Sequence, residues 1–354
     1  MTIDKRIAAF DSLGDFLSQF TQKSIQKKDN IPFNDLFFDL FKTQIEKAKN
    51  FNGWFTKENI LYAFENWSLL LNSNILNKWI LTYTLNNKKI NTIAVIMAGN
   101  IPLVGFHDFL SVLMSGNNLI VKQSSNDKQF LPLITKYLET IEPDFKGKIE
   151  FTEDKLVNFD AVIATGSNNT ARYFDYYFNK YPNIIRQNRN AIAVISGDES
   201  DLELQNLGED IFRYFGLGCR SVSKVFVPKN YDFNKLFKNI YPYKDLIQYK
   251  KYENNYTYNK AVYLMSKYKL LENGFLMLKE DTSYASPIAT LFYEYYDDLE
   301  LLKQRFIIEK EQIQCIVANQ GIEDEIAFGE TQKPKLWDYA DGVDTLHFLE
   351  KLEQ

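Results

Sequence analysis

A cysteine flanked by glycines is the residue of this chain whose type and setting best suit covalent chemistry. Cys219 is one of two cysteines and stands in the run Phe215-Gly216-Leu217-Gly218-Cys219-Arg220-Ser221-Val222. Glycines let the backbone approach a ligand closely, and the adjacent guanidinium favours the thiolate, which attacks carbonyl carbon. The run therefore suits covalent catalysis on an acyl group, but a small buried cysteine in a tight turn also fits it.

Two polar loops follow predicted strands, where open α/β sheets bind ligands. The first, residues 98–102, contains Asn100, whose amide can donate a hydrogen bond to a developing oxyanion. The second is Lys122-Gln123-Ser124-Ser125, in which Lys122 can reach a ribose hydroxyl or a phosphate. Each also has an ordinary structural interpretation, because asparagine is common in turns and a lysine at a strand end can extend to water.

A third loop, residues 165–170, places Gly166 and Ser167 between a predicted strand and a predicted helix. Backbone amides at the positive end of that helix would suit a pyrophosphate. Ser167 or Asn168 could equally be a helix N-cap. Neither GxGxxG nor GxxxxGK[ST] occurs in the sequence, so neither a standard Rossmann fingerprint nor a P-loop applies.

The elements that would position these loops alternate between strand and helix. Helical periodicity covers residues 3–20, 34–49 and 56–71, and strands are expected at 92–97, 118–122, 149–151, 159–164, 191–195, 224–228, 261–265, 289–295 and 314–318. This alternation predicts an α/β fold with parallel sheets and right-handed crossovers. We predict a helical N-terminus with a dinucleotide-binding α/β domain over residues 1–190, a catalytic α/β domain carrying the cysteine over 191–330, and a C-terminal segment, 331–354, that packs back on the active-site cleft.

Composition excludes several classes of protein. The chain has 354 residues, of which 45% are hydrophobic, so it can bury a large core. A net charge of −5 provides no electrostatic footprint for nucleic acid or for an anionic membrane surface. The first residues lack the pattern of a signal peptide, and no apolar run approaches the roughly 20 residues of a membrane span. A cytoplasmic protein without disulfides or a metal site is therefore expected.

Taken in chain order, these motifs resemble the aldehyde dehydrogenase superfamily. Within it, the chain is similar to the acyl-CoA reductase family typified by the fatty acid reductase of bacterial bioluminescence. The resemblance covers roughly residues 90–345 and rests on the segments 97–105, 121–125, 164–167, 214–223 and 286–289. It implies an aldehyde dehydrogenase-like fold of two three-layer α/β domains with parallel-rich sheets.

The resemblance also implies a mechanism and roles for the singled-out residues. Cys219 would take the acyl group as a thioester, and Asn100 with the amide of Cys219 would form the oxyanion hole. Hydride from a nicotinamide would then reduce the acyl-enzyme to an aldehyde. The residues that would hold the cofactor are Lys122, Ser124, Ser125, Gly166 and Ser167.

Two departures from the superfamily pattern refine this expectation. Aldehyde-oxidising members carry a water-activating glutamate before the cysteine, but residues 155–198 contain none, and Arg186 to Asn190 stand at about that place. Reduction of an activated acyl group is therefore favoured over hydrolysis. NAD-preferring members often carry a glutamate where this chain has Ser125, so NADPH is expected. The nearby Asp127 keeps NADH open as the alternative.

The donor and the partners stay open at this point. The expected donor is a fatty acyl-CoA or an acyl-protein thioester, with an acyl phosphate or a non-catalytic scaffold as alternatives. An acyl-activating synthetase is the expected partner, and self-association into a homo-oligomer is a further expectation. His107 begins a predicted helix and is either an acid/base group or a packing residue. Cys315 is expected in the core.

Overall fold

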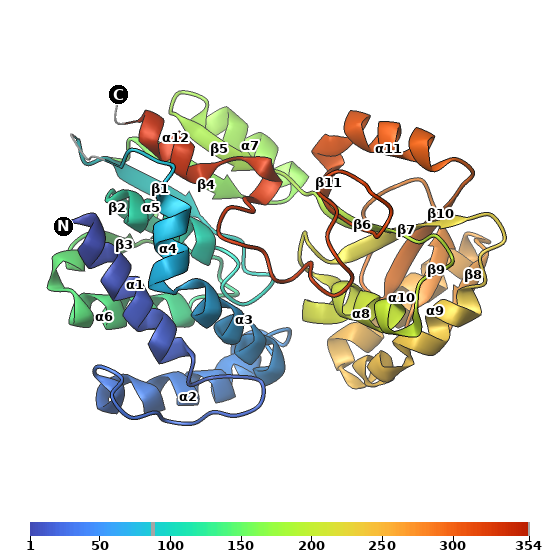
Figure 1. Ribbon diagram of the computed structural model, residues 1–354, viewed down its shortest axis with the longest axis horizontal. Coiled ribbons are helices and arrows are strands. Elements are labelled where there is room, and N and C mark those ends of the chain that lie inside the picture. Colours follow the sequence, from blue (N-terminus) through green and yellow to red (C-terminus); the bar gives the residue numbers. More distant parts are fainter. Residues whose placement is uncertain (86–88, 353–354) are drawn as a thin grey trace. The chain divides into compact units, whose positions relative to one another are not determined.

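The computed structural model describes residues 1–85 and 89–352, and the chain divides into two compact units (Figure 1). The first unit contains Met1–Gln187 and Lys335–Gln354, and the second contains Asn188–Pro334. The chain therefore leaves the first unit once and returns to it near its C-terminal end. Each unit has its own sheet and its own hydrophobic core.

Amphipathic helices form the N-terminal part of the first unit, as the periodicity predicts. They are α1 (Ile3–Leu17), α2 (Asn34–Phe51), α3 (Lys57–Leu70) and the short α4 (Ser73–Ile80), which was not expected. The side chains of Thr2 and Thr56 accept hydrogen bonds from backbone amides in the first turns of α1 and α3, so both are N-caps. Fully buried rings, among them Phe16, Phe20 and Phe41, hold the helices together.

The sheet of the first unit is parallel and has the strand order β3-β2-β1-β4-β5. Its strands are β1 (Thr92–Ile96), β2 (Asn118–Lys122), β3 (Ile149–Phe151), β4 (Ala161–Thr165) and β5 (Asn183–Arg186). The chain runs from β1 to β2 and β3 on one side, then to β4 and β5 on the other. The order therefore reverses between β1 and β4, and ligands bind outside the carboxyl ends of the strands at such a point.

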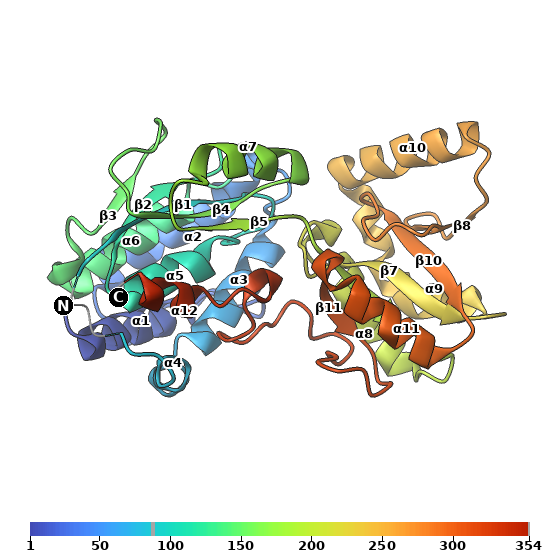
Figure 2. The same cartoon turned by 90° about the horizontal axis from the view of Figure 1, so that it is seen from above.

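Different helices cover the two faces of this sheet (Figure 2). Because side chains alternate along a strand, Ile93 and Val95 of β1 join the large core formed with the N-terminal helices, α5 (Phe106–Ser115), α6 (Phe130–Ile141) and α12 (Thr345–Lys351). Ala94 and β4's Val162 point the other way, into a smaller cluster that includes Phe174 and Phe178 of α7 (Asn168–Phe178). The first unit is thus a three-layer α/β structure.

The second unit has a sheet with the strand order β11-β6-β7-β10-β9-β8. All pairs are parallel except β8 with β9. The strands are β6 (Asn190–Val194), β7 (Val222–Pro228), β8 (Leu270–Glu272), β9 (Met277–Glu280), β10 (Thr290–Tyr296) and β11 (Ile313–Val317). Its α-helices are α8 (Asp201–Phe212), α9 (Phe233–Ile240), α10 (Lys250–Met265) and α11 (Leu299–Ile308).

The structure corrects the strand assignment in three places. The expected strand at 261–265 is wrong, since these residues end α10, where Val262, Leu264 and Met265 are exposed rather than in a sheet. The structure also contains β5 and the β8–β9 hairpin, which were not expected. Among residues 1–85 and 89–352, we find no helix long and apolar enough to cross a membrane.

Candidate active site

The three loops singled out in the first unit start at neighbouring strand ends. Ile96 at the end of β1 is in register with Lys122 of β2 on one side and with Ala164 of β4 on the other. The strands are parallel, so their carboxyl ends meet at one edge of the sheet, where the strand order reverses. The structure therefore brings the Asn100, Lys122 and Gly166 loops to the same edge.

The first two loops pack directly against each other. A Cβ added at Gly99 would lie 2.6 Å from the Cβ of Ser124, so only glycine allows this approach. The side-chain amide of Asn52 lies 3.4 Å from each of two carbonyl oxygens, Gly99 O and Asn126 O, and donates to both. Asn100 is partly buried in the resulting loop, whereas Ser125 is exposed.

A buried carboxyl, Asp127, also joins these loops. Its Oδ2 accepts a hydrogen bond from the backbone amide of Leu103 at 3.3 Å, while its Oδ1 has no partner among the described residues. Leu103 has a φ of 57°, in the left-handed region. Burial raises the pKa of Asp127 to about 7, and the Leu103 amide partly offsets this shift. Asp127 therefore lies inside the packing of the two loops.

Lys122 and Ser167 both make local hydrogen bonds, of which the N-cap at Ser167 is one of the two alternatives that the sequence left open. The Nζ of Lys122 donates to the carbonyl oxygen of Asp154 at 2.8 Å. The hydroxyl of Ser167 accepts from the Thr170 amide and is the N-cap of α7. A Cβ on Gly166 would lie 3.0 Å from side-chain atoms of Thr170 and Phe174. These contacts fix the start of α7, and a role in cofactor binding stays a prediction.

Cys219 lies on a tight turn in the second unit. The Ser221 amide donates to the Gly218 carbonyl oxygen at 2.9 Å, which places Cys219 in the middle of the turn. Cys219 is exposed, so the alternative interpretation as a small buried cysteine is wrong, whereas Cys315 in β11 is buried, as expected. The turn follows η2 (Arg213–Gly216), a short segment in which Tyr214 and Phe215 do not have helical backbone angles.

The backbone before this turn adopts an unusual conformation. Tyr214 and Phe215 have φ angles of 55° and 60°, and Gly216 continues at 75°. Two consecutive non-glycine residues in the left-handed region carry strain of roughly 1–2 kcal/mol each. Both side chains are buried, and the ring of Phe215 packs against Tyr249 at 5.0 Å between centroids. Packing therefore holds the chain in the shape that leads to the cysteine.

At about the place where the resemblance leads us to expect a glutamate in aldehyde-oxidising members, this chain has a buried arginine. Arg186 ends β5 beside Thr165 and forms an ion pair with Asp108 of α5. It also donates to the hydroxyl of Thr345 at 3.0 Å. The arginine and aspartate side chains are each 6% exposed. A guanidinium carries no oxygen, so Arg186 cannot activate a water molecule as a glutamate at this place would.

His107 is a packing residue in this structure. Its Nε2 lies 2.8 Å from the carbonyl oxygen of Leu336, and the rings of Trp67, Trp79 and Tyr339 surround it. Burial lowers its pKa. No cluster of three or more His, Cys, Asp or Glu side chains suited to a metal occurs in the described part of the chain.

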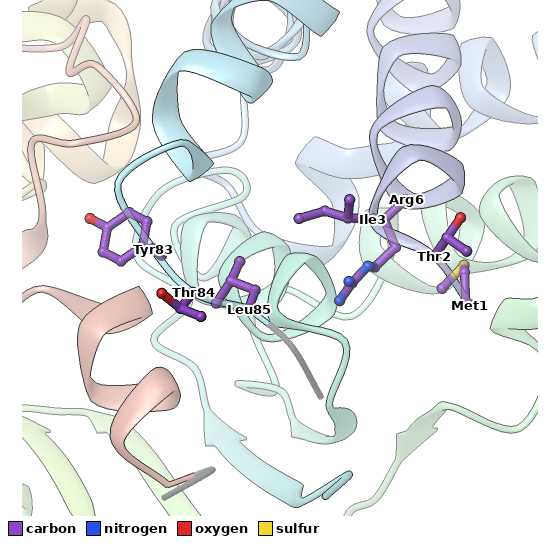
Figure 3. Close-up of a pocket in the computed structure, with 7 residues that line it drawn as sticks. All are labelled: Met1, Thr2, Ile3, Arg6, Tyr83, Thr84 and Leu85. Atoms are coloured by element: carbon purple, nitrogen blue, oxygen red, sulfur yellow. The ribbon is translucent and has the colours of Figure 1, made fainter. Parts of the chain in front are cut away.

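A hollow of about 440 Å³ lies elsewhere in the first unit (Figure 3). The described residues that line it are Met1, Thr2, Ile3, Arg6, Tyr83, Thr84 and Leu85. None of them is a predicted site residue. The predicted residues instead fall into two sets, with Cys219 in the second unit and the others in the first.

Comparison with known proteins agrees with the resemblance stated above. The model of the acyl-CoA reductase (LuxC) family matches residues 20–236. No curated protein matches the chain.

Among solved structures, aldehyde dehydrogenase 21 from Physcomitrella patens in complex with succinate is similar, with a TM-score of 0.61, 12% identity and coverage of 90% of this chain and 78% of that one. The aldehyde dehydrogenase KauB from Pseudomonas aeruginosa gives a TM-score of 0.60 at 12% identity, covering 91% and 77%. The NAD+ complex of an aldehyde dehydrogenase from Bacillus cereus gives 0.57 at 13%, covering 91% and 73%.

These structures are too distant in sequence to indicate more than the fold, whereas the family match covers more than half of the chain. The protein therefore has the aldehyde dehydrogenase fold and belongs to the acyl-CoA reductase (LuxC) family, which makes it an oxidoreductase of acyl or aldehyde groups.

Proposed function

We propose that the protein reduces an activated fatty acyl group to the aldehyde, with Cys219 as the nucleophile and NADPH as the reductant. One observation carries the proposal: the cysteine of the family-matched segment is exposed on a tight turn that follows the buried side chains of Tyr214 and Phe215. An exposed cysteine whose neighbour in sequence is an arginine suits a thiolate that accepts an acyl chain from a thioester.

In the proposed reaction the Cys219 thiolate attacks the carbonyl carbon of an acyl-CoA. A carbon–sulfur bond to the enzyme forms, the bond to coenzyme A breaks, and the coenzyme A thiolate leaves and takes up a proton. Asn100 is proposed to stabilise the developing oxyanion with its amide. Once the acyl group on Cys219 has received a hydride, its carbon–sulfur bond to the enzyme breaks, which releases the aldehyde and regenerates the Cys219 thiolate. The balance is one acyl-CoA, one NADPH and one proton consumed for one aldehyde, one NADP+ and one coenzyme A.

The donor groups of the first unit fit a dinucleotide. Phosphates and ribose are suited by a cation, hydroxyls and backbone amides. The cation is the amino group of Lys122, and the hydroxyls are those of Ser124 and Ser125. The backbone amides lie at the start of α7, at Gly166 and Ser167. When bound, the nicotinamide nucleotide supplies the hydride. Ser125 presents no carboxylate, so a ribose 2′-phosphate meets no repulsion from it, which supports NADPH over NADH.

The ion pair at Arg186 supports reduction rather than hydrolysis. A thioester on Cys219 survives until hydride transfer only if water attack is slow, and the residue at the glutamate position is held by Asp108 and Thr345. The acyl donor is proposed to be a fatty acyl-CoA or an acyl-protein delivered by an acyl-activating synthetase. Self-association and a cytoplasmic location stay predictions.

The test is acyl-dependent NADPH consumption by the wild type, Cys219→Ala and the matched control Cys315→Ala. We expect a long-chain acyl-CoA to support consumption by the wild type and by Cys315→Ala, with loss of at least ~100-fold in Cys219→Ala, because the covalent step is gone. NADPH consumption with an acyl phosphate but not with acyl-CoA would show that the acyl phosphate is the donor and that the proposed thioester donor is wrong. If neither donor is reduced and neither acylates Cys219, as seen by mass spectrometry, the protein is a scaffold and the proposal is wrong.

A further inference from the structure

A buried carboxylate, Asp210 of α8, holds a loop that lies more than a hundred residues further along the chain. Its Oδ2 accepts a hydrogen bond from the Gly329 amide at 2.7 Å. Its Oδ1 accepts from the amide of Thr331 at 3.0 Å and from the Thr331 hydroxyl at 2.8 Å. Asp210 and Thr331 are both fully buried. Both carboxylate oxygens are therefore committed to the 329–331 loop.

The same loop holds the turn that carries Cys219. The Nε of Arg220 donates to the carbonyl oxygen of Thr331 at 2.6 Å. The side-chain amide of Gln332 donates to the hydroxyl of Ser221 at 3.2 Å. Arg220 and Ser221 directly follow the cysteine, and Ser221 closes the turn onto Gly218. Hydrogen bonds thus connect Asp210 through Thr331 to Arg220, which is covalently next to Cys219 in the chain.

This arrangement needs an ionised carboxylate. Three donors point at the two carboxylate oxygens. A proton on either oxygen would face one of these donors and could not form the hydrogen bond, and the same holds for the NH2 group of an asparagine in place of Asp210. Burial raises the pKa of Asp210 to about 6, and the hydrogen bonds from Gly329 and Thr331 partly offset this shift. Glu209 is the nearby acidic group and raises the pKa further, while its own carboxylate pairs with Arg213 and Tyr243.

We propose that Asp210 is a positioning residue for the nucleophile: it fixes the 329–332 loop, which holds the Arg220 guanidinium and the turn that carries Cys219, and the guanidinium fixed in this way favours the Cys219 thiolate. The inference rests on the proposed role of Cys219 and extends it. Loss of the carboxylate releases Arg220, and the thiolate loses the neighbouring cation that favours it. Its consequence is measurable on the thiol itself, without any acyl donor.

The test is the rate of Cys219 alkylation by iodoacetamide on the full chain, followed by peptide mass spectrometry from about pH 5 to about pH 9. In Asp210→Asn we expect the rate near neutral pH to fall at least roughly threefold and the profile to move to higher pH. The wild-type profile should also contain an inflection near pH 6 that this variant lacks. Thr331→Val, which removes one donor, should move the profile in the same direction, and Thr331→Ser should restore it.

Glu199→Gln is the matched control, because Glu199 is a buried carboxylate of the same unit that accepts from the Ser196 and Gly197 amides and has no bond to the cysteine turn. Its alkylation profile should equal that of the wild type. If Asp210→Asn fails to fold, as judged by circular dichroism, the alkylation profile of Thr331→Val tests the proposal instead. A wild-type profile in a folded Thr331→Val would overturn the proposal. If the wild type does not reduce any acyl donor but Asp210→Asn still slows Cys219 alkylation, the proposed reaction is refuted and the positioning role is supported.

Discussion

Replacing Asp127 by asparagine should make the first unit more stable above neutral pH. Asp127 is 6% exposed, and its pKa is raised to about 7 in the folded protein against 3.8 for an ordinary aspartate. Between these two values the folded state binds the proton and the unfolded state does not. The contribution of Asp127 to the free energy of unfolding is therefore largest below about pH 4, and it is lost as the pH rises through about 7.

The size of the effect follows from the pKa. At 1.36 kcal/mol per pKa unit, the shift corresponds to a cost of about 4 kcal/mol once the buried carboxyl is ionised. Asparagine cannot ionise. Its NH2 group would take the place of Oδ1, which has no partner among the described residues, and burying this unpaired donor costs about 1–3 kcal/mol at every pH. The free energy of unfolding of Asp127→Asn relative to the wild type should therefore rise by about 3 kcal/mol between pH 5 and pH 8.

Urea denaturation followed by tryptophan fluorescence measures this unit selectively. All four tryptophans, Trp54, Trp67, Trp79 and Trp337, belong to the first unit. Asp175→Asn, which changes an exposed carboxylate on α7, is the matched control and should show a much smaller pH dependence relative to the wild type. An Asp127→Asn difference that stays the same at pH 5 and pH 8 would refute the reasoning, because the carboxyl would then ionise equally in both states.

Two further predictions concern the cofactor and the buried ion pair. Ser125→Glu should shift the ratio of kcat/KM for NADPH over NADH at least tenfold toward NADH, since a carboxylate repels the 2′-phosphate by about 1.4 kcal/mol or more; an unchanged ratio would remove Ser125 from the cofactor site. Arg186→Met should lower the free energy of unfolding by about 3–5 kcal/mol by leaving Asp108 buried without its charge partner. Tryptophan fluorescence measures this loss, and the exposed Arg172→Met should leave stability within about 0.5 kcal/mol.

Much of the fold could be predicted because several buried strands are short apolar runs between polar residues. Strands β1, β2, β4, β6 and β7 overlap the predicted runs to within a few residues. The run at 261–265 has the same composition but ends a helix whose buried side chains, Tyr252, Tyr256 and Asn259, follow helical spacing further upstream. β5 was missed because it has only four residues between polar neighbours.

The candidate site could be predicted only where function depends on a local motif. Glycines and polar residues directly after apolar runs identified the Asn100, Lys122 and Gly166 loops, and the glycines around Cys219 identified the cysteine. Asp210 gave no such signal, since its partners at 329–331 are more than a hundred residues away and become neighbours only in the folded unit. The sequence indicates for Asp127 only that NADH stays open as the cofactor, because its burial also depends on tertiary packing.

The return of the C-terminal segment to the first unit has a consequence for synthesis on the ribosome. Leu336, Leu346 and Leu349 complete the core of a unit whose other residues are made first. The second unit is continuous in sequence and can therefore finish folding while the first still lacks α12. Domains fold as units during synthesis, so the nascent first unit must keep an uncovered apolar surface on α5 until α12 has been synthesised. That interval is when the chain most needs protection from aggregation.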